Sequence, residues 1–158
     1  MERVNSARIF APRQRIFDLA SQVERWPELL PHYRWVEVRG HLKDGRRIVE
    51  MAASRDGIPV RWVAIQGLRP AEGIITFRHI GGPTRGMDVA WVLRDDGHGA
   101  VDTRIDHHFT PAWPPLVGPW IARHVVGDFF VGPIADRTLA MIKGIAEAPR
   151  APGGLAWM

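Results

Sequence analysis

The strongest constraint on the fold is a run of six short segments between residues 33 and 110 in which apolar and polar residues alternate. A period of two residues is typical of β-strands that bury one face. Turn-forming pairs such as Asp44-Gly45 and Asp56-Gly57 separate the segments, and strands joined by such short links form an antiparallel meander. The sequence therefore predicts strands over 33–42, 46–55, 58–69, 72–80, 85–96 and 99–110.

Segments on either side of this run complete the expected topology. Residues 3–10 predict a first strand, and helical spacing predicts a helix over 12–21, followed by a short second helix around Glu28-Leu29-Leu30. Helical spacing returns near Trp120 and lasts to about Glu147. We expect a kink or break at Gly132-Pro133, because proline removes a backbone donor and clashes with the preceding turn.

A seven-stranded antiparallel sheet must bury one apolar face, and the last helix is the only predicted element long enough to cover it. The sequence thus predicts an α+β fold in which a strongly curved sheet wraps around a long C-terminal helix. A gap between the sheet and the helix would form a cavity. Residues 1–147 are expected to form a single domain, and the segment 148–158, rich in Pro and Gly, a flexible tail.

Composition excludes several classes of function. The chain of 158 residues has no Cys, which rules out disulfides, a thiol nucleophile and cysteine-based metal centres. Basic residues are scattered rather than clustered, so we expect no nucleic-acid partner. No apolar run approaches the length of a membrane span, and the N-terminus lacks the apolar stretch of a signal peptide. We expect a cytoplasmic monomer or homodimer without metal or cofactor.

Alternation along the strands predicts which side chains face the cavity. The chain has seven Trp, and an indole suits both core packing and the wall of an aromatic-binding site. Polar side chains on the inner face must bond either to one another or to a ligand. The candidate ligand-binding residues are Trp26, Trp35, Trp62, Gln66, Met87, Val89, Trp91, Thr103 and His107.

Other catalytic patterns are absent from the sequence. There is no HExxH, GxSxG or Walker-type motif. His107 and His108 are adjacent on a strand, so their rings point to opposite faces and cannot hold one metal ion. No carboxylate falls on the predicted inner face, which argues against hydrolysis by paired carboxylates.

Several segments together resemble a known family. They are Asn5-Ser6, Ile16-Phe17-Asp18-Leu19, Val23–Leu29, Met87–Trp91 and Ile142-Lys143. They resemble the polyketide cyclase/dehydrase branch of the START-like (SRPBCC/Bet v 1-like) superfamily, and are similar to tetracenomycin-type aromatase/cyclases.

The resemblance implies a helix-grip fold that holds hydrophobic or aromatic molecules between the sheet and the long helix. By position, it also implies that Trp26, Tyr33, Trp62 and Trp91 line the pocket. Gln66 stands where the aromatases place an arginine, and an amide cannot stabilise an enolate as a cation does.

Three functions remain open from the sequence. The first is a carrier or sensor of a lipid, a quinone or a polyketide-like aromatic molecule. The second is a polyketide aromatase/cyclase or dehydratase, with Tyr33 and His107 as the catalytic acid and base. The third is an interaction module with a filled cavity, for which the stiff segment 111–120 is the candidate surface.

Overall fold

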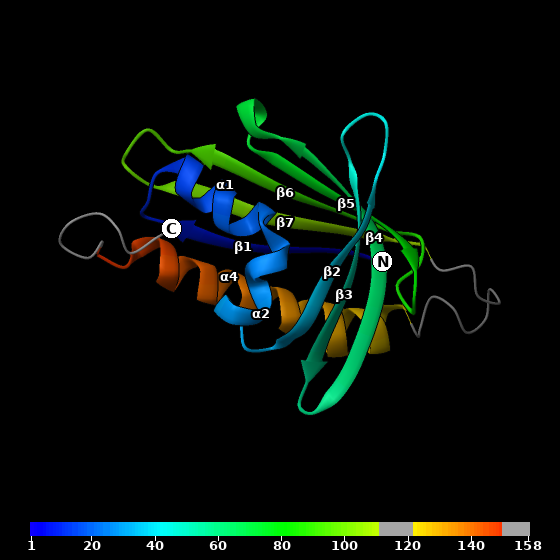
Figure 1. Ribbon diagram of the computed structural model, residues 1–158. Coiled ribbons are helices and arrows are strands. Elements are labelled where there is room, and N and C mark those ends of the chain that lie inside the picture. The colour runs from blue at the N-terminus through cyan, green and yellow to red at the C-terminus, as the bar shows by residue number, and fades with distance from the viewer. Residues whose placement is uncertain (111–121, 150–158) are drawn as a thin grey trace.

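The structure is a computed structural model, which describes residues 1–110 and 122–149. A curved seven-stranded sheet wraps around the C-terminal helix (Figure 1). The segment 111–120 and the end of the predicted tail, 150–158, lie outside the described residues.

All neighbouring strands of the sheet are antiparallel, in the order β1-β7-β6-β5-β4-β3-β2. Six strands therefore form the predicted meander, and β1 pairs with the last of them. The strands are β1 Glu2–Ile9, β2 Tyr33–His41, β3 Arg47–Arg55, β4 Ile58–Arg69, β5 Ile74–Gly81, β6 Met87–Asp95 and β7 Val101–Phe109.

Two short helices follow β1, as predicted: α1 spans Arg13–Ser21 and α2 spans Trp26–Leu29, with a 3₁₀ turn at Val23–Arg25 between them. Helix α1 packs against both β6 and the C-terminal helix α4, Gly132–Glu147. Helix α1 therefore lies against both the sheet and α4 (Figure 1).

The long helix changes type at the predicted break. A π-helical segment, Ala122–Val131, leads directly into α4, and Val131 keeps helical angles of φ −64° and ψ −50°. Pro133 is the second residue of α4 and cannot donate a backbone hydrogen bond to the preceding π-helical turn. Proline thus marks a change in hydrogen-bond spacing, and the chain stays helical across it.

Burial follows the predicted alternation. Along β6, Met87, Val89, Trp91 and Leu93 are buried, and the residues between them are more exposed. Strand β7 repeats the pattern, with every second residue from Val101 to Phe109 buried. Several boundaries differ by one or two residues. Pro70–Glu72 form a 3₁₀ turn, so β5 begins at Ile74 instead of residue 72, and β6 and β7 begin at Met87 and Val101 instead of residues 85 and 99.

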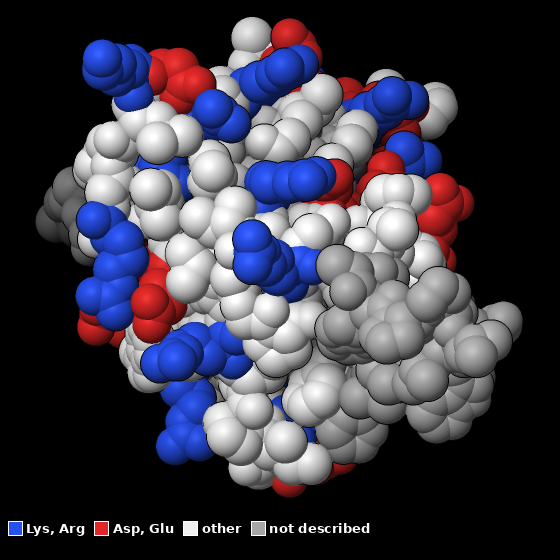
Figure 2. Space-filling view, turned by 90° about the vertical axis from the view of Figure 1, so that its right-hand side faces the viewer, with Lys and Arg blue, Asp and Glu red and all other residues white. Residues whose placement is uncertain are grey.

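Surface charges are mixed on the face shown in Figure 2, where basic side chains are spaced apart and acidic ones lie between several of them. Within the described part of the chain, no helix is long and apolar enough to cross a bilayer.

Candidate functional site: a tryptophan-walled pocket beneath the C-terminal helix

A pocket of about 90 Å³ lies between the inner face of the sheet and the C-terminal helical region. This volume is well below the ~300–1,000 Å³ of typical ligand pockets, so a larger ligand requires the walls to move. No described lining residue is Asp, Glu, Lys or Arg. The lining residues are Trp26, Tyr33, Met51, Val60, Trp62, Phe77, His79, Thr84, Met87, Val89, Trp91, Ile105, His107, Phe130, Val131, Ile134, Ala135 and Thr138.

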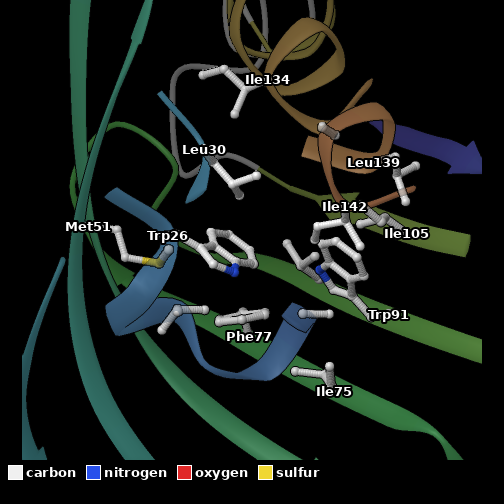
Figure 3. Packing of buried hydrophobic residues seen from close by; sticks show 14 of the residues in the cluster. Trp26, Leu30, Met51, Ile75, Phe77, Trp91, Ile105, Ile134, Leu139 and Ile142 are labelled. Carbon is white, nitrogen blue, oxygen red and sulfur yellow. The ribbon is translucent and has the colours of Figure 1, made fainter. Parts of the chain in front are cut away.

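A continuous series of aromatic rings forms much of the wall. Trp26 contacts both Trp91, with ring centroids 6.1 Å apart, and Tyr33, at 4.8 Å. Tyr33 in turn meets Trp62 at 6.2 Å, and Trp62 stacks on His79 at 5.9 Å with an interplanar angle of 10°. Figure 3 shows Trp26 and Trp91 between the strands below and the helix above. These rings give the pocket flat, rigid and mainly apolar walls.

A hydrogen bond to a residue outside the pocket helps to fix the Trp26 side chain. Its indole Nε1–H donates to the Leu19 carbonyl of α1 at 2.9 Å, and the side chain is buried. The donor of this indole is therefore already used, so Trp26 offers a ligand only its apolar ring.

His79 and Thr84 form a polar pair in the pocket wall. Nδ1 of His79 is hydrogen-bonded to the Thr84 hydroxyl at 2.6 Å, and both residues are buried. Burial lowers the pKa of His79 to about 3, and the neighbouring His107 acts in the same direction while Asp88 opposes it. The imidazole is therefore neutral near pH 7, with Nε2 left for a further hydrogen bond.

His107 is the second imidazole in this wall. It is 6% exposed, and its Nδ1 has no hydrogen-bond partner within the described part of the chain. Burial lowers its pKa to about 4, and a backbone hydrogen bond to Arg3 offsets part of that effect. His107 pairs with Val89 of β6, and Val89 pairs with Phe77 of β5, so His79 lies two residues along β5 from the position opposite His107 and on the same face. The two histidines thus form one polar end of a largely apolar pocket.

Tyr33 faces the pocket near a third buried histidine, His32. The Thr138 hydroxyl donates to the Ile134 carbonyl at 2.7 Å, so its oxygen accepts from His32 Nε2 at 2.8 Å. The Tyr33 hydroxyl lies 3.5 Å from the same oxygen. Burial raises the pKa of Tyr33 above its usual range, so its hydroxyl remains protonated and can donate a hydrogen bond or a proton.

Burial also lowers the pKa of His32 to about 4, with a further contribution from the positive charge of Arg137. His32 does not line the pocket. Among the residues that the structure describes, no three His, Asp or Glu side chains form a group that could hold a metal ion.

Gln66 lies outside the pocket lining, in a closed hydrogen-bond cluster. Its side-chain oxygen accepts two hydrogen bonds from Arg47, from Nε at 2.9 Å and from Nη2 at 2.7 Å, and its amide donates to the Ser21 carbonyl at 2.8 Å. Arg47 also pairs with Glu24 at 2.9 Å. The cluster joins β3 and β4 to the end of α1. Arg47 is bound in this cluster and does not line the pocket.

The structure gathers most of the sequence-predicted residues at one pocket: Trp26, Tyr33, Trp62, Met87, Val89, Trp91 and His107 all line it. Trp35, Gln66 and Thr103 were expected to contact a ligand, and they are not among the lining residues. Thr103 is buried and its hydroxyl donates to the Val101 carbonyl at 3.5 Å, while Trp35 is half-buried on the edge strand β2.

Sequence reasoning missed His79, Thr84 and Thr138. Alternation along β5 could have predicted His79, because it lies on the same face as the buried residues Ile75 and Phe77. Thr84 belongs to a Gly-rich turn and Thr138 to the helix, and nothing in the local pattern says that either hydroxyl meets a buried histidine.

Comparison with known proteins identifies the class. The polyketide cyclase / dehydrase and lipid transport family matches residues 9–123, more than half of the chain. The chain therefore belongs to this family, as the sequence resemblance predicted, and its architecture is the helix-grip fold.

Solved structures with the same fold include the aromatase/cyclase Zhui from Streptomyces sp. R1128, with a TM-score of 0.82 and 21% identity over 98% of this chain and 99% of that chain. A START superfamily protein from Mycobacterium smegmatis has a TM-score of 0.71 and 16% identity, over 92% and 97% of the two chains. The di-domain ARO/CYC BexL has a TM-score of 0.69 and 21% identity, over 90% of this chain and 45% of its own. At these identities the likeness establishes the fold alone.

Proposed function

We propose that the chain binds a hydrophobic or aromatic small molecule, such as a lipid, a quinone or a polyketide-like compound, as a carrier or sensor. The observation that carries this proposal is a pocket walled by three Trp rings with no charged side chain among its described lining residues. Burying a planar apolar molecule against such walls is favourable by about 25 cal/mol per Å² of apolar surface. The family, whose description includes lipid transport, supports the same function.

Ligand binding requires the pocket to expand beyond 90 Å³. Met51 and Met87 line it, and an unbranched thioether side chain can change rotamer at low energetic cost. The walls can thus adapt to ligands of different shape.

Intrinsic Trp fluorescence, titrated with a fatty acid, a quinone and an aromatic ketone, tests the proposal. We expect saturable quenching by at least one of the three, because Trp26, Trp62 and Trp91 line the pocket. Ala135→Phe, which places a ring in the pocket, should abolish the response. Ala140→Phe puts the same ring on the exposed side of α4 and should leave the response unchanged. Flat titrations with all three ligands would contradict the proposal.

A second candidate function is a polyketide aromatase/cyclase or dehydratase. It is favoured by the presence of Tyr33 and His107 in the same pocket, one protonated and the other neutral. Neutral His107 would accept an α-proton from a poly-β-ketone, and the Tyr33 hydroxyl would protonate a carbonyl or a leaving hydroxyl. The glutamine at position 66 weighs against it, because no cationic side chain is among the described lining residues to stabilise a developing enolate.

This second function is tested by adding a reactive polyketide mimic and following ring formation. The catalytic function requires a slower rate in Tyr33→Phe and in His107→Gln. Equal rates in the unmodified chain and both variants would count against it.

A further inference from the structure

We propose that the pocket selects by charge and by one polar group: it binds uncharged aromatic alcohols, that is phenols and enols, and excludes carboxylates of the same shape. In this proposal His79 is the specificity-determining residue. The inference rests on the proposed function, because it concerns the ligand class of the same pocket.

Exclusion of anions follows from the chemistry of the wall. No described lining residue carries a charge that could pair with a carboxylate. Arg47 on the neighbouring strand β3 is bonded to Gln66 and Glu24 and does not line the pocket. A carboxylate in the pocket would therefore lose its hydration without gaining a cation, which is strongly unfavourable.

Preference for a hydroxyl follows from the polar end of the pocket. His79 is fixed by the hydrogen bond to Thr84 and by its stack on Trp62, and its Nε2 is the ring nitrogen left for a ligand. The His107 side chain is only 6% exposed, and its Nδ1 has no hydrogen-bond partner within the described residues. A neutral imidazole nitrogen either donates or accepts according to the tautomer. A ligand hydroxyl can do both, so it satisfies either tautomer.

Aromatic stacking should orient the ligand so that its hydroxyl reaches this end. Trp62 lies beside His79, and Trp26 and Trp91 continue the wall away from it. A planar molecule along these rings would place one edge at the two histidines. Trp rings thus supply the affinity for the apolar body, and His79 supplies the discrimination between polar groups.

The test compares three bicyclic probes of nearly equal shape by isothermal titration calorimetry at pH 7. They are 2-methylnaphthalene, 2-naphthol and 2-naphthoate. We expect 2-naphthol to bind about fivefold more tightly than 2-methylnaphthalene, the effect of one ordinary hydrogen bond. We expect 2-naphthoate to bind at least tenfold more weakly than 2-naphthol, because its charge is desolvated without a partner.

The variant His79→Phe tests whether His79 causes the preference for 2-naphthol. Phenylalanine keeps a ring against Trp62 and removes both nitrogens, so the preference for 2-naphthol over 2-methylnaphthalene should fall to less than twofold, with His107 the polar ring that remains. His79→Gln retains a donor and an acceptor and should keep part of the preference. His108→Phe makes the same change on the exposed face of β7 and should leave the preference intact.

The outcomes separate this inference from the proposed function. If 2-naphthoate binds as tightly as 2-naphthol, or if His79→Phe keeps the full preference for 2-naphthol, the selectivity proposal is overturned while ligand binding stands. If none of the three probes binds while the fatty acid, the quinone or the aromatic ketone still quenches the Trp fluorescence, this inference is overturned and the proposed function stands. If those titrations are flat as well, both fail. The comparison of probes on the unmodified chain needs no variant, so a variant that does not fold leaves that test intact.

Discussion

Two polar regions lie on the inner face of the same sheet, and they differ in whether their hydrogen bonds are complete. Around Gln66, the side chain bonds Arg47 and the Ser21 carbonyl, and Arg47 pairs with Glu24. Around His79 and His107, one ring bonds Thr84, and Nδ1 of His107 lacks a partner within the described residues. The first region lies outside the pocket lining, and the second lines the pocket.

This difference distinguishes structural from ligand-binding polar groups. A buried polar group without a partner is unfavourable by about 1–3 kcal/mol, so a fully bonded cluster stabilises the fold by itself. In the proposed function, a ligand completes the hydrogen bonding of the histidine end, whereas the Gln66 cluster is complete within the protein and contributes to fold stability.

The largest expected difference between the two regions is in their response to acid. His32, His79 and His107 have pKa values of about 4, 3 and 4, below the ordinary 6.5 that they regain on unfolding. The unfolded chain therefore binds more protons below pH 6.5. The stability that neutral burial provides is present above that pH and is lost as the pH falls towards 3–4, by about 1.4 kcal/mol per pH unit for each such histidine.

Chemical denaturation at several pH values between 4 and 7 measures this loss. His79→Gln should reduce the slope of unfolding free energy against pH, whereas His41→Gln, at an exposed position, should leave it unchanged. A stability that does not change between pH 7 and pH 5 would show that the histidines are not buried as described.

Gln66→Leu should have the next largest effect, on stability rather than on binding. The substitution removes the Gln66 acceptor of Arg47 and the amide donor to the Ser21 carbonyl, while Arg47 keeps Glu24 and a longer bond to that carbonyl at 3.3 Å, so the free energy of unfolding should fall by about 1–2 kcal/mol. Gln66→Glu keeps the acceptors for Arg47 and should lose less. Urea denaturation gives the stability and a 2-naphthol titration the affinity. A large loss of affinity in the folded Gln66→Leu variant would place Gln66 in the ligand site after all.

Trp62→Ala and Trp35→Ala form a matched pair for ligand affinity. Trp62 lines the pocket and stacks on His79, so its loss should weaken 2-naphthol binding about tenfold, equivalent to ~1.4 kcal/mol. Trp35 is absent from the lining, and its removal should change the affinity less than twofold. Calorimetric titration of both variants with 2-naphthol measures the two affinities. Equal losses of affinity would contradict the conclusion that Trp62 lies in the site and Trp35 outside it.

Tyr33→Phe should have the smallest effect. The Tyr33 hydroxyl is 3.5 Å from Thr138 Oγ1, a long contact, so stability should fall by only about 0.5–1 kcal/mol. If the chain is a carrier or sensor, ligand affinity should stay within twofold. A rate of ring formation that drops sharply while affinity holds would instead favour the catalytic function.

Much of the fold could be predicted because each strand carries its own evidence. The alternation of Met87, Val89 and Trp91 in β6 identifies a buried face without reference to any other segment. The same local reasoning identified the two short helices and the long C-terminal helix. It set the start of β5 slightly too early because Pro70–Glu72 forms a 3₁₀ turn, which alternation does not distinguish from a strand end.

Partners between distant segments could not be predicted in this way. The sequence predicts that Gln66 and His107 are both polar residues on the inner face of the sheet. It leaves open whether each side chain forms hydrogen bonds to the protein or to a ligand. The answer for Gln66 depends on Arg47 directly opposite it in the β3–β4 register and on the end of α1. These are relations of tertiary structure, and only coordinates reveal them.

The central claim, that a small molecule binds beneath α4 against the tryptophan wall, is tested most directly by NMR of the indole N–H groups during titration with 2-naphthol. The account predicts saturable shifts for the assigned signals of Trp26, Trp62 and Trp91, with the Trp35 signal unmoved. Unchanged signals for the first three at saturating probe, or a shift confined to Trp35, would contradict it.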